Sequence, residues 1–147
     1  SYWFRRLWYK DNETKNYLMK KKYLIVIADY YKDITKGLLN SALKSIPKSN
    51  SIKIIKVPGV FEIPVTISKN MKKHDGFLAL GCVIKGETPH FDFISSASTK
   101  AIMQLSVDSK KPIGNCIIKC LNMRQAKARK NKGAEAAKAV ISILLQK

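Results

Sequence analysis

Apolar and polar residues follow two patterns along this chain, and the two patterns alternate. Short, nearly continuous apolar runs are typical of strands buried in a parallel sheet. Residues that are apolar at every third or fourth position are typical of amphipathic helices. The apolar runs cover 23–28, 52–57, 76–84 and 112–118, and the helical patterns cover 34–46, 64–73, 93–109, 122–129 and 134–145.

Several residues mark where these elements begin or end. Asp33 is placed to cap the first helix, and Pro47 is placed to stop it. Pro64 suits the first turn of the second helix, where its missing N–H breaks no hydrogen bond. Strands and helices alternate with short connections, which predicts an α/β fold, a three-layer α/β/α sandwich around a four-stranded parallel sheet. No linker or repeat interrupts the pattern, so we expect one core domain.

The chain is strongly basic. Its 147 residues include 28 Lys and Arg against 10 Asp and Glu, a formal net charge of +18. Such an excess suits nucleic-acid binding, and it also suits a surface that is merely rich in lysine. The lysines are scattered singly and in pairs rather than gathered on one element, which favours the second interpretation. Nucleic acid is therefore not an expected partner. No apolar run reaches the roughly 18 residues of a membrane span, so a membrane is not an expected partner either.

The three cysteines, Cys82, Cys116 and Cys120, lie in or beside apolar runs and form no C-x-x-C motif. We therefore expect free thiols and a reducing cytoplasm rather than disulfides. A zinc site using Cys116, Cys120 and a histidine has ligand spacing unlike that of known structural zinc sites. The sequence thus predicts no metal centre.

Residues 1–18 differ in character from the rest of the chain. They contain Trp3, Trp8 and an arginine pair, whereas Met19 and three lysines directly precede the first strand. We predict that 1–18 is an N-terminal extension outside the core fold, which spans 19–147. A membrane-surface helix, a transit peptide and an arm packed on a neighbouring subunit are the alternatives.

Polar and aromatic residues lie after the end of each predicted strand. The carboxyl ends of parallel strands share one edge of the sheet, where such folds bind ligands, so these residues should gather there. They are Tyr30 and Tyr31 after the first strand, Gly59, Val60, Phe61 and Glu62 after the second, Gly86, Glu87, Thr88 and His90 after the third, and Asn115, Lys119 and Arg129 around and after the fourth.

The chemistry of these residues suits a phosphorylated ligand. Thr88 and the amides at 86–88 precede a helix, and helix N-termini bind phosphate. Arg129 would add a guanidinium fork, Glu62 could accept hydrogen bonds from hydroxyls, and an imidazole such as His90 serves general acid–base catalysis. Each residue also has a purely structural interpretation, such as a capping histidine or a packed tyrosine. Spacing alone therefore supports only an α/β protein with a phosphate ligand.

Three blocks of sequence carry a resemblance to a known family. They read Val-Pro-Gly-Val-Phe-Glu-Ile-Pro at 57–64, Leu-Gly-Cys-Val-Ile-Lys-Gly-Glu-Thr-Pro-His-Phe-Asp-Phe at 80–93, and Asn-Lys-Gly-Ala-Glu-Ala-Ala at 131–137. In this order and separation they resemble the lumazine synthase family, and the similarity runs from about Lys22 to Gln146. The resemblance implies the flavodoxin-like lumazine synthase fold.

The resemblance also implies an activity and an assembly. The enzyme would be a transferase of riboflavin biosynthesis that condenses 5-amino-6-ribitylaminouracil with 3,4-dihydroxy-2-butanone 4-phosphate. The products would be 6,7-dimethyl-8-ribityllumazine, water and phosphate, formed without cofactor or metal. The family assembles as pentamers, often further into icosahedral capsids, with sites at subunit interfaces. A homo-oligomer is therefore implied, and riboflavin synthase is a candidate protein partner.

Roles for single residues come from the same resemblance. His90 would carry protons as the catalytic residue, while Lys132 and Glu135 would support a site built at the interface. Arg129 would reach the phosphate from the adjacent subunit. The implied substrate-binding residues are Tyr30, Val60, Phe61, Glu62, Val83, Ile84 and Asn115 for the pyrimidine and ribityl groups, and Gly86, Glu87, Thr88 and Arg129 for the phosphate.

The chain departs from the family pattern in three places. Asp29-Tyr30-Tyr31 stands where the family usually has Arg-Phe-Asn, with Tyr30 in place of the ring-stacking Phe. Asn115 replaces an aromatic residue, and the segment between Arg129 and Asn131 is several residues shorter than usual. Loss of an aromatic lid at 115 predicts weaker binding of the uracil substrate. An activity-decayed, shell-forming relative of the same fold is therefore the alternative function.

Overall fold

The computed structural model describes residues 12–48 and 51–146. Within these residues one sheet is formed by β1 (Tyr23–Ala28), β2 (Ile52–Val57), β3 (Gly76–Ile84) and β4 (Ile113–Cys120). All pairings are parallel, and the order across the sheet is β2-β1-β3-β4. The helices are α2 (Asn12–Met19), α3 (Lys32–Ser45), α4 (Ile63–Lys69), α5 (His90–Ser109), α6 (Met123–Ala128) and α7 (Lys132–Leu144), with short 3-10 turns η1 (Val60–Glu62) and η2 (Met71–Lys73).

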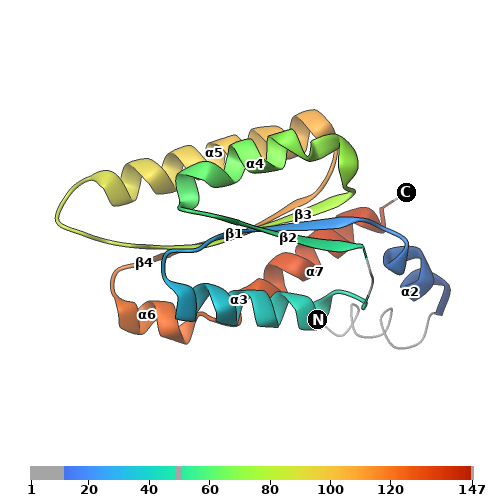
Figure 1. Ribbon diagram of the computed structural model, residues 1–147, viewed down its shortest axis with the longest axis horizontal. Helices are drawn as coiled ribbons and strands as arrows, with labels where there is room; N and C mark the ends of the chain where they lie inside the picture. The colour runs from blue at the N-terminus through green and yellow to red at the C-terminus, as the bar shows by residue number, and fades with distance from the viewer. Residues whose placement is uncertain (1–11, 49–50, 147) are drawn as a thin grey trace.

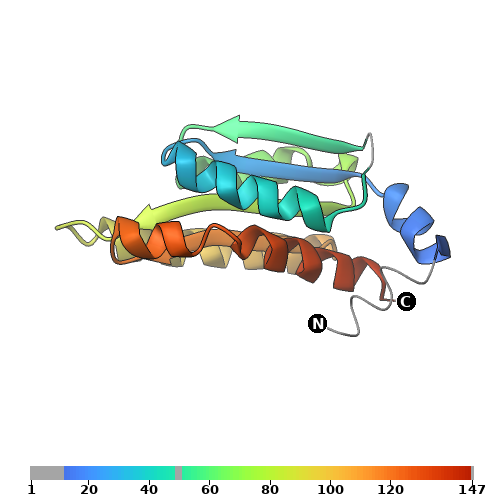
Figure 2. The same ribbon diagram turned by 90° about the horizontal axis from the view of Figure 1, so that it is seen from below.

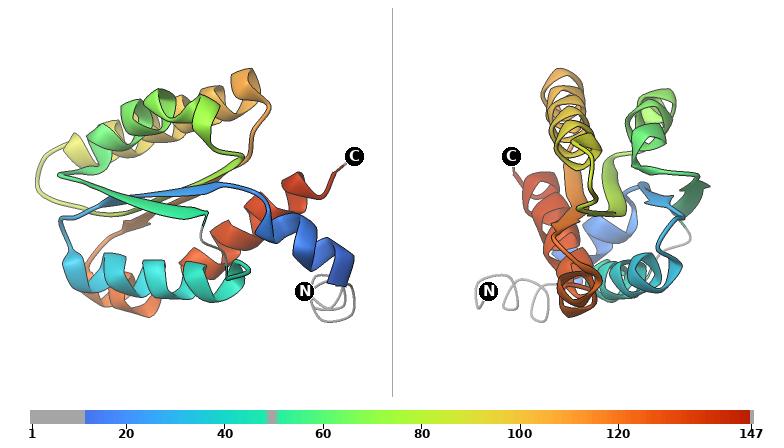
Figure 3. Two further views of the ribbon diagram at one scale, coloured as in Figure 1. Left: turned by 45° about the vertical axis from the view of Figure 1, so that its right-hand side comes forward. Right: turned by 90° about the vertical axis from the view of Figure 1, so that its left-hand side faces the viewer.

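The helices cover both faces of the sheet. Helices α4 and α5 lie on one face, and α3, α6 and α7 lie on the other (Figure 1). The end-on view shows the two helical layers with the sheet between them (Figure 3). The predicted three-layer α/β/α sandwich with a four-stranded parallel sheet is confirmed.

Alternate residues of the central strands feed two separate cores. On β1, Ile25 and Ile27 belong to the core beneath α3 and α7, whereas Leu24 and Val26 belong to the core beneath α4 and α5. Because both faces are covered, every residue of β1 is buried, which explains why its sequence reads as a continuous apolar run. The outer strands β2 and β4 keep exposed positions.

Helices α3 and α7 lie side by side beneath the sheet (Figure 2). Their backbones approach closely at Gly133, where an added Cβ would overlap the carbonyl oxygen of Leu38 and lie 2.6 Å from Ser41 Oγ. The side chain of Ser41 also reaches across and donates to the carbonyl oxygen of Lys130. A glycine at 133 is therefore a requirement of helix packing.

Helix α2 packs on the end of α7. Leu18 is buried against Ile141 and Leu144. The hydroxyl of Tyr23 donates to the carbonyl oxygen of Leu18 at 2.8 Å, and the hydroxyl of Tyr17 donates to that of Leu144 at 3.2 Å. The C-terminal part of the predicted 1–18 extension thus touches the core, while 1–11 lies outside the described residues.

The prediction that Asp33 caps the first helix is wrong. Helix α3 begins at Lys32, and its N-cap, Tyr31, makes no side-chain capping bond. The carboxylate of Asp33 instead accepts a hydrogen bond from Lys130 Nζ at 2.8 Å, and this ion pair lowers the pKa of Asp33. Asp33 lies inside the first turn of α3, so its carboxylate is not at the capping position and pairs with a segment almost a hundred residues away.

Other boundaries shift by a few residues. Helix α4 ends at Lys69 rather than 73, because Asn70 satisfies its last turn: Asn70 Nδ2 donates to the carbonyl oxygen of Thr66 at 2.8 Å. Helix α5 begins at His90, three residues before the predicted start, and α7 begins two residues early. Strand β4 continues to Cys120, two residues beyond its predicted end, because Ile84 and Cys120 extend its pairing with β3.

Candidate active site

The connections that leave the four strands meet at one end of the sheet, which we name the exit edge. It comprises residues 29–31, 58–62, 85–89 and 121–122, and it lies at the left of Figure 1. Parallel strands bring these segments together because all of their carboxyl ends point the same way. The backbone N–H of Asp29 donates to the carbonyl oxygen of Val57 at 2.8 Å, which ties the first two connections to each other.

A pocket of about 320 Å³ opens at this edge. Six of the predicted site residues line it, from the ends of β1 and β3, from η1 and from the start of α5: Tyr30, Val60, Phe61, Val83, Ile84 and His90. The remaining lining residues are Ala28, Tyr31, Gly59, Cys82 and Ile94. The walls are therefore mostly apolar, with an imidazole and two phenols as polar groups.

Two aromatic rings stand at the pocket with most of their surface in solvent. Tyr30 is 73% exposed and Phe61 is 76% exposed, which is unusual for large rings in a folded chain. Tyr30 packs edge-to-face on Tyr31, with ring centroids 4.9 Å apart. Rings held in place but uncovered can stack on a planar ligand.

His90 is the first residue of α5, so its imidazole projects from the helix N-terminus at the pocket. Its backbone N–H donates to Thr88 Oγ1 at 3.4 Å, which orders the turn before the helix. The second histidine, His74, is buried at the other end of the sheet, where Nδ1 contacts the carbonyl oxygen of Asn70 and the ring packs on Phe77. His90 is therefore the imidazole available to a ligand.

The polar loop at 86–88 lies beside the pocket rather than in its lining. Gly86, Glu87 and Thr88 are exposed, and no atom lies within 4 Å of the position a Cβ would take at Gly86. Glu62 is half-buried on η1, with Oε1 3.4 Å from the position of a Cβ on Gly59. These four predicted residues flank the pocket and face solvent.

The other predicted residues gather in a different pocket. Asn115, Arg129, Lys132 and Glu135 line a cavity of about 340 Å³ between the outer strand β4 and α7. Arg129 Nη1 donates to the carbonyl oxygen of Lys119 at 3.0 Å, and Lys132 forms a salt bridge with Glu135 at 3.2 Å. Asn115 Oδ1 accepts a hydrogen bond from the backbone N–H of Ile117 at 3.1 Å. Neither of these two pockets joins this group to His90.

The thiols near these pockets are poor nucleophiles. Burial raises the pKa of Cys82 to about 12, with Cys120 as a second cause, and burial together with Glu135 raises the pKa of Cys116 to about 12. Both remain protonated at neutral pH. All three cysteines are free, and the described residues contain no cluster of three or more His, Cys, Asp or Glu placed to hold a metal ion.

Three lining residues, Ala28, Cys82 and Ile94, were not among the predicted residues of this edge. Ile94 lies one helical turn after His90, so the i, i+4 spacing places both on one face of α5. Cys82 precedes the polar loop on β3 and lies on the same face of the sheet as Ile84. Ala28 is the last residue of β1, so all three positions can be inferred from the spacing once the element boundaries are known.

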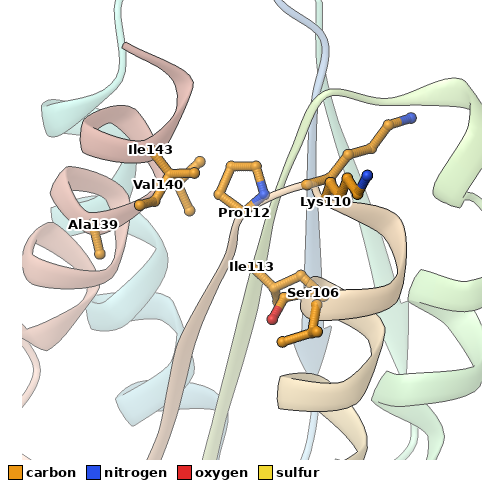
Figure 4. Close-up of a pocket in the computed structure, with 9 residues that line it drawn as sticks. Ser106, Lys110, Pro112, Ile113, Ala139, Val140 and Ile143 are labelled. Carbon is orange, nitrogen blue, oxygen red and sulfur yellow. The ribbon is translucent and has the colours of Figure 1, made fainter. Parts of the chain in front are cut away.

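Another pocket, of about 330 Å³, lies at the opposite end of β4 between α5 and α7 (Figure 4). Apolar residues such as Pro112, Ile113 and Val140 form most of its wall, with Lys110 and Lys111 beside them. It contains no histidine and no carboxylate, so it lacks groups for acid–base chemistry at neutral pH. None of the described helices has the length and apolar character of a membrane span.

Comparison with known proteins places the chain in a family. The sequence model of the 6,7-dimethyl-8-ribityllumazine synthase family matches residues 20–147. The chain belongs to this family. Proteins of that name from Bartonella tribocorum and Agrobacterium fabrum are 41% and 39% identical to it over 140 residues each, covering 88% and 86% of this chain and 93% and 95% of theirs. A third, from Ruthia magnifica, is 34% identical over 152 residues, covering 92% of this chain and 91% of its own.

The matched region begins at residue 20, close to the predicted boundary between residues 18 and 19. That boundary stays a prediction, because Leu18, on the N-terminal side of the boundary, packs on α7. The resemblance seen in the sequence blocks at 57–64, 80–93 and 131–137 is confirmed by the family match.

Proposed function

We propose that this protein is a 6,7-dimethyl-8-ribityllumazine synthase, a transferase that condenses 5-amino-6-ribitylaminouracil with 3,4-dihydroxy-2-butanone 4-phosphate. One observation carries the proposal. In a chain of this family, His90 lines the same pocket as two solvent-exposed aromatic rings, Tyr30 and Phe61, at the exit edge of a parallel sheet. The pocket offers a stacking surface and a proton carrier to one ligand.

The pyrimidine half of the reaction belongs to this pocket. Tyr30 would stack on the uracil ring, with Phe61, Val60, Val83 and Ile84 as the apolar walls. The ribityl hydroxyls would donate to Glu62, whose carboxylate lies half-buried next to the pocket residue Gly59. Asn115 would approach the same ligand from a second copy of the chain.

The phosphate would bind in front of α5. Gly86, Glu87 and Thr88 precede the helix N-terminus and are exposed, so their backbone and the Thr88 hydroxyl can reach an anion. Arg129 would supply the guanidinium from a neighbouring subunit, with Lys132 and Glu135 beside it. Within one chain Arg129 is held against β4 in a separate pocket, which suits a site completed by a second copy.

His90 would move protons during the condensation. The amine of the uracil attacks the ketone carbonyl, and proton transfers through the imidazole allow water to leave as a Schiff base forms. Loss of phosphate and ring closure need the same group to take and return protons. Holding both reactants in one closed site supplies a further part of the rate enhancement. The reaction is redox-neutral and releases one phosphate and two waters, the first as the Schiff base forms and the second as the ring closes.

We further propose that the chain works as a homo-oligomer, a pentamer or an assembly of pentamers such as an icosahedral capsid. The division of the site residues between two pockets supports this assembly. Three free buried cysteines suit a cytoplasmic location, and riboflavin synthase, which would consume the product, is a candidate partner.

Mixing the purified protein with both substrates tests the activity directly. We expect lumazine fluorescence to appear when both are present and to be absent when either is omitted. A folded oligomer that gives no fluorescence would support the alternative, an activity-decayed shell-forming relative, and would rule out the proposed reaction.

A further inference from the structure

The structure gathers lysines at the end of the sheet opposite the candidate active site. We name this end the entrance edge; it comprises the described connections that lead into the strands, at 20–22, 46–48, 70–75 and 110–112. These connections carry one carboxylate, Asp75, and eight lysines, at positions 20, 21, 22, 48, 72, 73, 110 and 111. The connections of the exit edge carry three carboxylates and one lysine, Lys85. The lysines of the connections are therefore concentrated at the entrance edge.

Parallel topology turns these separate lysines into a row. The strand order β2-β1-β3-β4 places Lys48 first, then the lysines at 20–22, then Lys72 and Lys73, then Lys110 and Lys111. Neighbouring strands lie about 4.8 Å apart, so four strands spread the row over roughly 14 Å. The row lies at the right of Figure 1, where the strands begin.

Most of these lysines are free to bind a partner. Six of the eight are exposed, and none of the three salt bridges between described residues involves any of them. The one carboxylate of the edge, Asp75, already accepts a hydrogen bond from the backbone N–H of Lys22 at 2.8 Å. Lys21 and Lys111 are half-buried; Lys21 lies over the Tyr17 ring, and Lys111 donates to the carbonyl oxygen of Met71 at 2.7 Å.

Lys110 occupies a position that normally belongs to glycine. It directly succeeds α5 with φ 58° and ψ 26°, the left-handed conformation in which a side chain is strained. It is the one non-glycine residue with positive φ in the described part of the chain. Figure 4 shows its side chain extending beside Pro112, at the rim of the apolar pocket between α5 and α7. Many helices end in this conformation, and here it places an exposed lysine at the corner where the entrance edge begins.

We propose that the entrance edge binds the phosphate backbone of nucleic acid. A line of ammonium groups matches a linear chain of phosphates and reads no base sequence. The edge connections themselves contain no exposed large apolar side chain among the described residues, which argues against insertion into a membrane. This surface is separate from the proposed catalytic pocket, so both can be occupied together.

Matched charge variants test the proposal. The edge variant replaces Lys22, Lys72, Lys73 and Lys110 by Gln, and the control replaces Lys36, Lys56, Lys100 and Lys127, which are also exposed but lie elsewhere. Binding of a fluorescein-labelled uridine 20-mer RNA is followed by fluorescence anisotropy between about 50 and 200 mM KCl. We expect the edge variant to lose roughly tenfold in affinity and its log–log salt slope to flatten by about 0.7 for each lost contact. Lumazine formation should be unaffected.

Three results would overturn the proposal. Equal losses in the two variants would mean that binding depends on net charge alone. An RNA affinity that neither variant changes would show that the entrance edge does not bind RNA. Loss of binding to phosphatidylserine vesicles by the edge variant, with RNA binding intact, would assign the surface to a membrane.

A single Lys110→Gly variant gives a further readout, because it should raise the melting temperature while weakening RNA binding.

Discussion

Single residues at the exit edge differ in how far their local sequence fixes them. His90 sits at the start of α5, and its backbone N–H donates to the hydroxyl of Thr88 two residues before it, so the block at 80–93 already positions the imidazole. Arg129 is different, because its guanidinium is held by the carbonyl oxygen of Lys119 on the neighbouring strand. The position of His90 therefore follows from neighbouring residues in the sequence, whereas that of Arg129 depends on a contact with β4.

The Asn115 position tests the aromatic lid. Asn115 is exposed on β4, and its side chain satisfies only the backbone N–H of Ile117. Replacing it by Phe should lower the KM for the uracil substrate roughly threefold to tenfold, the value of one aromatic stacking contact, with kcat little changed. Steady-state fluorescence kinetics measure both constants. Asn115→Ala adds no ring and is the control. An equal fall of KM in both variants, or no fall in the Phe variant, would mean that an aromatic ring at 115 does not cover the uracil substrate.

Elements are held by contacts that override their own local preferences. Ala has a better helix propensity than Gly by about 1 kcal/mol, yet α7 carries Gly133 because α3 leaves no room for a methyl group. Likewise Asp33 is a good capping residue that instead pairs with Lys130. Packing decides the glycine, because its energies are larger than those of helix propensity, whereas Asp33 lies inside α3 because the helix begins at Lys32.

Gly133→Ala should therefore destabilise the fold. The methyl group would overlap the carbonyl oxygen of Leu38, a backbone atom that cannot rotate away. Overpacking of this kind costs about 1–3 kcal/mol and should outweigh the gain in helix propensity. Urea unfolding followed by circular dichroism measures the change. Gly86→Ala, where the new methyl meets nothing within 4 Å, should leave the midpoint unchanged; a stabilised Gly133→Ala variant would refute the close approach.

Leu18 links the predicted extension to the core. It is 1% exposed and packs on Ile141, so Leu18→Ala should cost about 2–4 kcal/mol, whereas the exposed Asn16→Ala should cost little. Deleting 1–18 should lower the stability similarly and leave lumazine formation intact, because the proposed site lies at the other end of the sheet. A truncated protein that fails to fold or to react would place the extension inside the core.

At the scale of the whole molecule, the predicted site residues fall into two pockets. The first holds His90 and the aromatic rings, and the second holds Asn115, Arg129, Lys132 and Glu135. In the proposed head-to-tail assembly, the first pocket of one copy would face the second pocket of the next, and each interface would form one complete site. The proposed activity then belongs to the assembly rather than to the chain.

Mixing two defective variants tests this sharing. His90→Ala should slow turnover by about a hundredfold without abolishing it, and Arg129→Ala should impair phosphate binding. In mixed oligomers, co-expressed or refolded together, some interfaces pair the intact His90 pocket of one variant with the intact Arg129 pocket of the other. Random mixing should restore about a quarter of wild-type activity. Activity that stays at the mean of the two variants would place the whole site within one chain.

The sequence by itself determined the order of strands and helices, because apolar periodicity reports local burial and three specific blocks report the family. It also determined which residue types lead out of each strand. It misplaced several helix ends, which depend on contacts such as that of Asn70 with Thr66, and it assigned Asp33 to a cap although α3 begins one residue earlier. Only the tertiary structure decided which residues share a pocket, and only it showed that lysines scattered singly and in pairs form one row. The shared pocket and the lysine row have the same physical reason: in a parallel sheet every strand ends at one edge and begins at the other.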